Sequence, residues 1–206
     1  MHDWIKDPAA IYADSFATIR REVDLGVVPA DMRDVMVRII HACGMTDIAQ
    51  DLAWSDGAGA AGAKALADGA PILVDAEMVA HGIIKRRLPR NNKVVCTLND
   101  PAVPGAAKSV GTTRSAMAVE LWRPMLEGAV IAIGNAPTAL FRLLELIEDG
   151  APKPALILGF PVGFVGAAES KEALLQSGLP FIALRGRRGG SAMAAAAVNA
   201  LAGGLE

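Results

Sequence analysis

His41 is the residue best suited to proton transfer in this chain, which has only three histidines among its 206 residues. Asp34 and Arg38 precede it by seven and three positions, so all three share one stripe of a predicted helix. A neighbouring cation favours neutral imidazole, which can accept or relay a proton near pH 7. Pairing between Asp34 and Arg38 would weaken that effect. A histidine near a helix end can also be structural, so its position alone leaves both interpretations open.

The helix that carries His41 is predicted to begin at Pro29 or Asp31 and to end at Cys43. Its apolar residues recur at helical spacing and define one buried face, which does not include His41. This face comprises Met32, Val35, Met36, Ile39, Ile40 and Cys43. Gly44 then supplies the left-handed backbone conformation with which many helices end.

A second helix, predicted over residues 8–23, presents Tyr12 and Ser15 on a face beside its apolar one. Tyr12 is the only tyrosine of the chain. No Gly-x-Ser-x-Gly motif, the usual setting of a nucleophilic serine, occurs in the sequence. We therefore interpret Ser15 as a hydrogen-bond donor to a ligand.

The composition, with 52% hydrophobic residues and a net charge of -2, fits one domain over residues 1–206 with a full core. The near-neutral charge and the scarce aromatic residues argue against a nucleic-acid partner. No apolar run is long enough to span a membrane, and the N-terminus does not read as a signal peptide. Cys43 and Cys96 lie far apart without metal-type spacing, so no metal site is expected and a reducing cytoplasm fits best.

From residue 71 onward, short and continuously apolar segments alternate with helical ones, which is typical of a parallel sheet with helices on both faces. We predict an α/β fold with a mostly parallel five-stranded sheet in a three-layer, flavodoxin- or Rossmann-like architecture with extra N-terminal helices. The strands are expected at residues 71–75, 93–98, 129–133, 155–159 and 181–184. Residues 46–54 are predicted to include a short helical stretch, residues 99–111 a loop, and residues 112–125 a helix that a threonine caps.

Ligands of such sheets bind outside the carboxyl ends of the strands. Four loops leave these ends, at residues 75–78, 134–138, 159–163 and 185–190, and they are rich in small residues, exposed amides or positive charge. The last three open helices, whose N-terminal amides favour anions. We expect a large carboxylate-bearing ligand there, although each loop could also be a simple turn. The candidate contacts in these loops are Glu77, Asn135, Thr138, Gly163 and Arg187. The glycine pattern of a dinucleotide-binding loop is absent.

Six strings distributed along nearly the whole chain resemble the precorrin-8X methylmutase family. They are IHACG (40–44), APILVDAEMV (70–79), TRSA (113–116), AIGNAPTAL (132–140), GFPVGFVGAAESK (159–171) and GRRGGS (186–191). The resemblance implies an isomerase of cobalamin biosynthesis that moves a methyl group from C11 to C12 of precorrin-8X and gives hydrogenobyrinate. It also implies a homodimer with sites near the subunit interface and no organic cofactor.

The resemblance places the family's active-site histidine at His41 and its substrate contacts at Ser15, Arg38 and Arg114. We expect Tyr12 and the strand-end loop residues to be further substrate contacts. An intramolecular methyl shift needs no nucleophile, metal or redox group, and a histidine that handles one proton could select the reactive tautomer.

Three alternatives remain at the level of the sequence. The substrate could be the cobalt-containing one of the anaerobic route. The protein could be a corrinoid carrier that binds and hands on hydrogenobyrinate without chemistry. A nucleotide-binding α/β domain is the third, and the missing fingerprint counts against it.

Overall fold

A six-stranded sheet lies at the centre of the structure, a computed structural model that describes residue 2 and residues 4–205. The strands are β1 (Leu52–Trp54), β2 (Ile72–Val74), β3 (Val94–Cys96), β4 (Val130–Ile133), β5 (Leu156–Gly159) and β6 (Phe181–Leu184). Their order is β1-β6-β5-β4-β2-β3, and all neighbours are parallel except β1 and β6. The predicted α/β fold with a mostly parallel sheet is confirmed.

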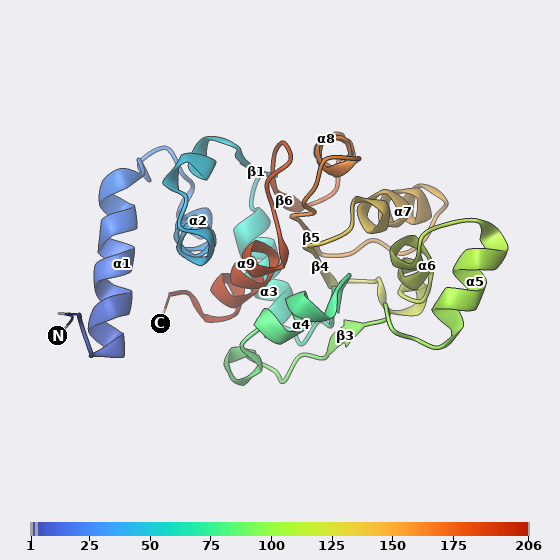
Figure 1. The fold of residues 1–206 in the computed structure, drawn as a ribbon, viewed down its shortest axis with the longest axis horizontal. Coiled ribbons are helices and arrows are strands. Elements are labelled where there is room, and N and C mark those ends of the chain that lie inside the picture. The colour runs from blue at the N-terminus through green and yellow to red at the C-terminus, as the bar shows by residue number, and fades with distance from the viewer. Residues whose placement is uncertain (1, 3, 206) are drawn as a thin grey trace.

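Helices cover both faces of this sheet (Figure 1). One face packs against α2 (Ala30–Cys43), α3 (Ala58–Ala67), α4 (Glu77–Gly82) and α9 (Ser191–Gly203), with α1 (Pro8–Glu22) outside α2. The other face packs against α6 (Arg114–Glu120), α7 (Pro137–Glu148) and α8 (Ala167–Gln176), with α5 (Ala102–Val110) beside α6. Three 3-10 turns, η1 (Thr46–Gln50), η2 (Lys85–Arg87) and η3 (Arg123–Met125), complete the described elements.

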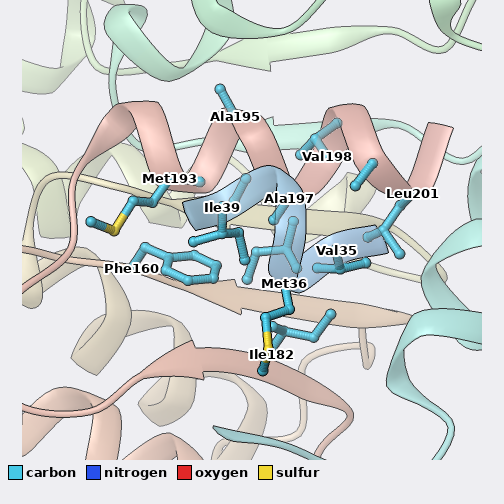
Figure 2. Packing of buried hydrophobic residues seen from close by; sticks show 14 of the residues in the cluster. Val35, Met36, Ile39, Phe160, Ile182, Met193, Ala195, Ala197, Val198 and Leu201 are labelled. Carbon is cyan, nitrogen blue, oxygen red and sulfur yellow. The ribbon is translucent and has the colours of Figure 1, made fainter. Parts of the chain in front are cut away.

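The strands divide their side chains between two hydrophobic cores, as the period of two requires. Ile72 and Val130 point into the core beneath α2 and α9, whereas Leu73 and Ile131 point into the core beneath α7. Figure 2 shows the first of these cores, where Met36 of α2 lies between α9 and the sheet. Because both faces are buried, the strands are apolar throughout, which explains why their sequence shows no alternation.

The expectation of five strands was wrong by one, because Leu52–Trp54 forms the antiparallel edge strand β1. Of the short helical stretch predicted within residues 46–54, the structure contains η1. Three residues are too few to show a period, and the pairing of β1 with β6 depends on a segment more than a hundred residues away.

The predicted loop over residues 99–111 was also wrong, because α5 occupies most of it. Pro101 is the N-cap and Pro104 falls in the first turn, where a helix needs no backbone N–H donor. Asp100 Oδ1 accepts a hydrogen bond from the Ala102 amide at 2.9 Å and so helps to begin the helix. The following helix, α6, ends five residues earlier than predicted, but its threonine cap is confirmed, since Thr113 Oγ1 accepts from Ala116 N at 3.1 Å.

None of the described helices is long and apolar enough to cross a lipid bilayer.

Candidate active site

His41 lies in the last turn of α2, and its Nδ1 is 2.8 Å from the Ser15 Oγ of α1. This hydrogen bond joins α1 to α2 through two residues that are 26 positions apart in the sequence. Gly44 ends α2 in the left-handed conformation (φ 69°), as predicted, with its amide donating to Ile40 O. Because Ser15 occupies Nδ1, the other ring nitrogen, Nε2, remains for a ligand.

Two aromatic rings of α1 hold the imidazole from the side. The Tyr12 and Phe16 ring centroids lie 5.4 and 5.1 Å from that of His41, and the Phe16 ring meets it edge-on. Phe16 is buried, whereas Tyr12 is half exposed. Tyr12 therefore has surface available for a ligand next to His41.

His41 lines two cavities. One, of about 330 Å³, lies between α1 and the end of α2 and also includes Ser15. The other, of about 240 Å³, is lined by Tyr12, Arg38 and His41 on one side and by Gly82, Ala192, Ala195, Ala196 and Asn199 on the other. The small residues of α9 leave room beside the imidazole.

Burial lowers the pKa of His41 below its usual 6.5, and the positive charge of Arg38 lowers it further. The imidazole is therefore neutral at physiological pH and can offer or accept a proton through Nε2. The predicted effect of Arg38 on the pKa of His41 is therefore present. Asp34 does not weaken it by pairing with Arg38, because Asp34 Oδ1 lies 3.8 Å from Arg20 Nη2 instead.

Arg38 is buried, although the predicted buried face of α2 does not include it. The prediction of one buried face on α2 was wrong, since Val37 and Arg38 of the second stripe are buried as well. The cause is that α1 and α9 both pack on α2, so little of its surface remains in water. The Arg38 guanidinium donates from Nη1 to the carbonyl oxygen of Leu205 at 3.1 Å.

A second group of candidate residues gathers at the carboxyl ends of β2, β3 and β4. Arg114 Nη2 donates to Leu98 O and to Asn99 Oδ1, both at 3.1 Å, and Asn99 Nδ2 lies 3.5 Å from Glu77 Oε1. Thr113 Oγ1 donates to Thr138 Oγ1 at 2.9 Å, which brings the start of α7 beside the start of α6. Neither cavity at His41 includes these residues, so they form a separate cluster.

Asp75 follows β2 and is hydrogen-bonded to the loop after β4. These two strands are neighbours in the sheet, and the chain continues from β2 to one side and from β4 to the other. Its carboxylate accepts hydrogen bonds from the amides of Gly134, Asn135 and Ala136 at 2.8, 2.9 and 2.7 Å. The expectation that these amides bind a ligand anion was therefore wrong, because a buried side chain of the protein already satisfies them. Desolvation of this carboxyl raises its pKa, and the three amides oppose that effect.

The third group lies in the loops after β5 and β6. Gly163 N donates to Arg187 O at 3.2 Å, and the Arg187 guanidinium lies over the exposed Phe164 ring at 5.2 Å. Lys171 of α8 is fully buried and donates from Nζ to Pro161 O and Arg188 O, at 3.1 and 2.7 Å. This lysine therefore joins the two loops.

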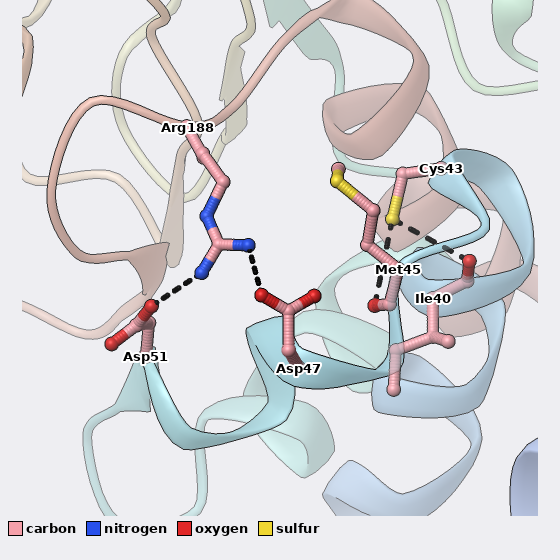
Figure 3. A network of polar contacts seen from close by, with 6 residues as sticks. All are labelled: Ile40, Cys43, Met45, Asp47, Asp51 and Arg188. Carbon is pink, nitrogen blue, oxygen red and sulfur yellow. Dashed lines mark hydrogen bonds and ion pairs between the residues drawn. The ribbon is translucent and has the colours of Figure 1, made fainter.

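Arg188 connects the β6 loop to the segment that follows His41. It donates to Asp47 at 2.6 Å and to Asp51 at 2.7 Å, as Figure 3 shows. Nearby, the Cys43 thiol faces the Ile40 and Met45 carbonyls, and burial raises its pKa. In the loop after β6, Arg188 therefore forms internal ion pairs, whereas Arg187 lies on the surface.

The sequence did not single out Asn199, a polar residue near His41. Its side chain accepts from Ile84 N and donates to Gly82 O, at 2.8 and 3.0 Å, in the wall of the smaller cavity. A polar residue inside an alanine-rich helix was the available signal. Among the residues that the structure describes, no three His, Cys, Asp or Glu side chains converge as metal ligands.

Known proteins resemble this chain over almost its full length. Residues 10–203 match the sequence family described as precorrin-8X methylmutase. The precorrin-8X methylmutase of Pseudomonas aeruginosa is 64% identical over 204 residues, 98% of either chain. The cobalt-precorrin-8 methylmutase of Salmonella typhimurium is 40% identical over 210 residues, 98% of this chain and 97% of that one.

The crystal structure of the precorrin-8x methyl mutase from Thermus thermophilus superposes with a TM-score of 0.87 at 41% identity, covering 94% of each chain. The family match therefore includes the segments that carry His41, Asp75 and Lys171. The chain belongs to the precorrin-8X methylmutase family, isomerases of cobalamin biosynthesis.

Proposed function

We propose that the chain converts precorrin-8X into hydrogenobyrinate, with His41 as the catalytic residue. The C11–methyl bond breaks and the C12–methyl bond forms within one molecule, so product and substrate are isomers and no electron acceptor is needed. The observation that carries the role of His41 is its neutral imidazole, which Ser15 orients through Nδ1 and which lines a cavity through its other edge.

His41 acts on a proton of the substrate through Nε2. If Ser15 donates its hydroxyl hydrogen to Nδ1, then Nε2 carries a hydrogen and donates it toward a ring nitrogen. If Nδ1 donates to the Ser15 oxygen, then Nε2 accepts. In either tautomer the imidazole is neutral, and the proton that it holds selects the ring tautomer from which the methyl group migrates.

The remaining candidates bind the macrocycle. Arg38 and Arg114 provide positive charge for its carboxylates, while Tyr12 presents an apolar ring face beside His41. Glu77, Asn135, Thr138, Gly163 and Arg187 complete the proposed set at the carboxyl ends of the strands. Since Arg38 and Arg114 belong to separate clusters, the substrate must extend between them, as a ring with several carboxylate arms can.

The metal-free substrate is favoured over the cobalt-containing one. Identity is 64% to a relative named for precorrin-8X and 40% to one named for cobalt-precorrin-8. Parallel assays with the two substrates decide between them, and a higher kcat/KM for the cobalt form would reverse this assignment.

We also propose a homodimer that works in the reducing cytoplasm. Phe164 and Val165 expose 87% and 89% of their surface in the loop after β5, which a second subunit would cover. The two cysteines are free thiols, as a reducing compartment requires. Light scattering of the purified protein gives the mass, and a monomer at micromolar concentration would contradict the dimer.

The decisive experiment follows the absorbance change of precorrin-8X with wild-type protein and with His41→Ala. We expect the variant to fold normally and to form no product. His81→Ala is the matched control, because His81 is exposed on α4 and its Nδ1 contacts only Glu77. Single-turnover conditions separate an enzyme from a carrier, since a carrier leaves the substrate spectrum unchanged. Full turnover by His41→Ala would refute the role of His41.

A further inference from the structure

Arg87 is a half-buried arginine with one buried N–H group that lacks a hydrogen-bond acceptor among the described residues. It ends the 3-10 turn η2, which follows α4. Its Nη1 is shielded from solvent and has no hydrogen-bond acceptor among the described residues. A buried N–H group without an acceptor is costly, and one that carries charge more so.

The charge of Arg87 acts on a second arginine, Arg38. Burial lowers the pKa of Arg38, and the charge of Arg87 lowers it further. Among the described residues, Arg38 donates to the Leu205 carbonyl, a neutral group. No carboxylate within residue 2 and residues 4–205 forms an ion pair with either arginine.

Arg38 adjoins the cavity at His41, and the segment that carries Arg87 lies beside it. Arg38 lines this cavity together with Gly82 and Asn199. Asn199 binds the backbone on both sides of the turn into η2, through Gly82 O and Ile84 N, and so fixes the segment that carries Arg87 against α9. The packing thus holds Arg38 and the segment that carries Arg87 beside the cavity at His41.

We propose that Arg87 and Arg38 together form a binding site for one carboxylate of the substrate, and that Arg87 is a substrate-anchoring residue. This proposal rests on the proposed function, because the macrocycle supplies the carboxylate. One carboxylate has two oxygens and can accept from both guanidinium groups, which removes the repulsion and supplies the missing acceptor. Arg38 is three residues from His41, so the anchored arm would set how the ring lies against the imidazole.

The test compares Arg87→Met with Arg86→Met, an exposed neighbour in the same turn. Hydrogenobyrinate binding is measured by absorbance titration, turnover with precorrin-8X, and folding by thermal denaturation. We expect Arg87→Met to raise the Kd and the KM by roughly ten- to a hundred-fold, the effect of losing a charge-assisted hydrogen bond, with kcat changed by less than about threefold. The Tm of the free protein should stay equal or rise, since a repulsion is removed.

A neutral probe distinguishes charge recognition from a structural role. The methyl ester of hydrogenobyrinate lacks the carboxylates, so wild type and Arg87→Met should bind it equally, and Arg87→Lys should restore part of the affinity for the free acid. An unchanged Kd for the acid, an equal loss for acid and ester, or a lower Tm together with the loss would each overturn the proposal. A wild-type protein that converts no precorrin-8X would instead refute the proposed function, and the acid–ester comparison would still decide the anion site.

Discussion

Lys171→Met is the substitution whose effect can be worked out most fully from the structure. Lys171 is fully buried on α8, and its Nζ donates to the carbonyl oxygens of Pro161 and Arg188. Burial lowers the pKa of Lys171 from 10.5 to about 8, and the neighbouring Glu172 opposes this only in part. Folding thus holds an ammonium group in a place where the neutral amine is favoured.

The sign of the pH dependence follows from proton binding. Between pH 8 and pH 10.5 the unfolded chain keeps the Lys171 proton while the folded protein releases it, so stability increases as the pH rises. A pKa that falls from 10.5 to about 8 corresponds to about 3 kcal/mol. Methionine has a similar length and no proton to release. The unfolding free energy of wild type minus that of Lys171→Met should therefore increase by about 3 kcal/mol from pH 8 to pH 10.5.

The assay is urea denaturation of both proteins at steps from pH 7 to pH 10.5, with Lys108→Met as an exposed control on α5. Other groups that titrate in this range are common to all three proteins and cancel in the difference. The control should remain parallel to wild type. If the pH dependence of Lys171→Met also ran parallel to that of wild type, burial would not shift the pKa of Lys171. That result would refute the argument made from its burial between the two loops.

Three further outcomes are expected. The acid limb of kcat/KM should lie below pH 6.5, because burial and the charge of Arg38 both lower the pKa of His41, and a limb above 6.5 would contradict the neutral imidazole. Ser15→Ala should reduce kcat about tenfold with little change in KM, since it removes one hydrogen bond that orients the ring; an unchanged kcat in stopped-flow assays would exclude that role. Asp75→Ala should lower the free energy of unfolding by about 3 kcal/mol in urea titrations, because three loop amides lose their acceptor, and a loss under 1 kcal/mol would mean that water replaces it.

Much of the fold could be predicted because local patterns encode it. The apolar runs of β2, β4, β5 and β6 and the helical spacing of α2 depend on neighbours a few residues away. The end of α2 at Gly44 and the cap of α6 at Thr113 are local for the same reason. What could not be predicted were β1 and α5, whose sequences either are too short for a period or contain prolines that suit a first turn as well as a loop.

The candidate site was predictable in part, and its contacts were not. Residue types and spacing singled out His41 and Arg38, and the string around them identified the family. The 2.8 Å contact between Ser15 and His41 depends on how α1 packs on α2, and no spacing within either helix encodes it. Likewise, the sequence offered Asp34 as the partner of Arg38, but burial of Arg38 against α9 separates the two.

The sequence by itself determined which chemistry is available: one helix-end histidine with a nearby arginine, and no nucleophile motif. It also determined the order of the strands and helices other than β1 and α5, because backbone geometry converts apolar periodicity into local structure. Only the tertiary structure decided which groups remain for a ligand. Asp75 accepts hydrogen bonds from the amides before α7, and Arg188 forms ion pairs with two aspartates. Arg87, in contrast, has a buried N–H group without an acceptor among the described residues. Such long-range pairings depend on packing between distant segments, which sequence spacing does not contain.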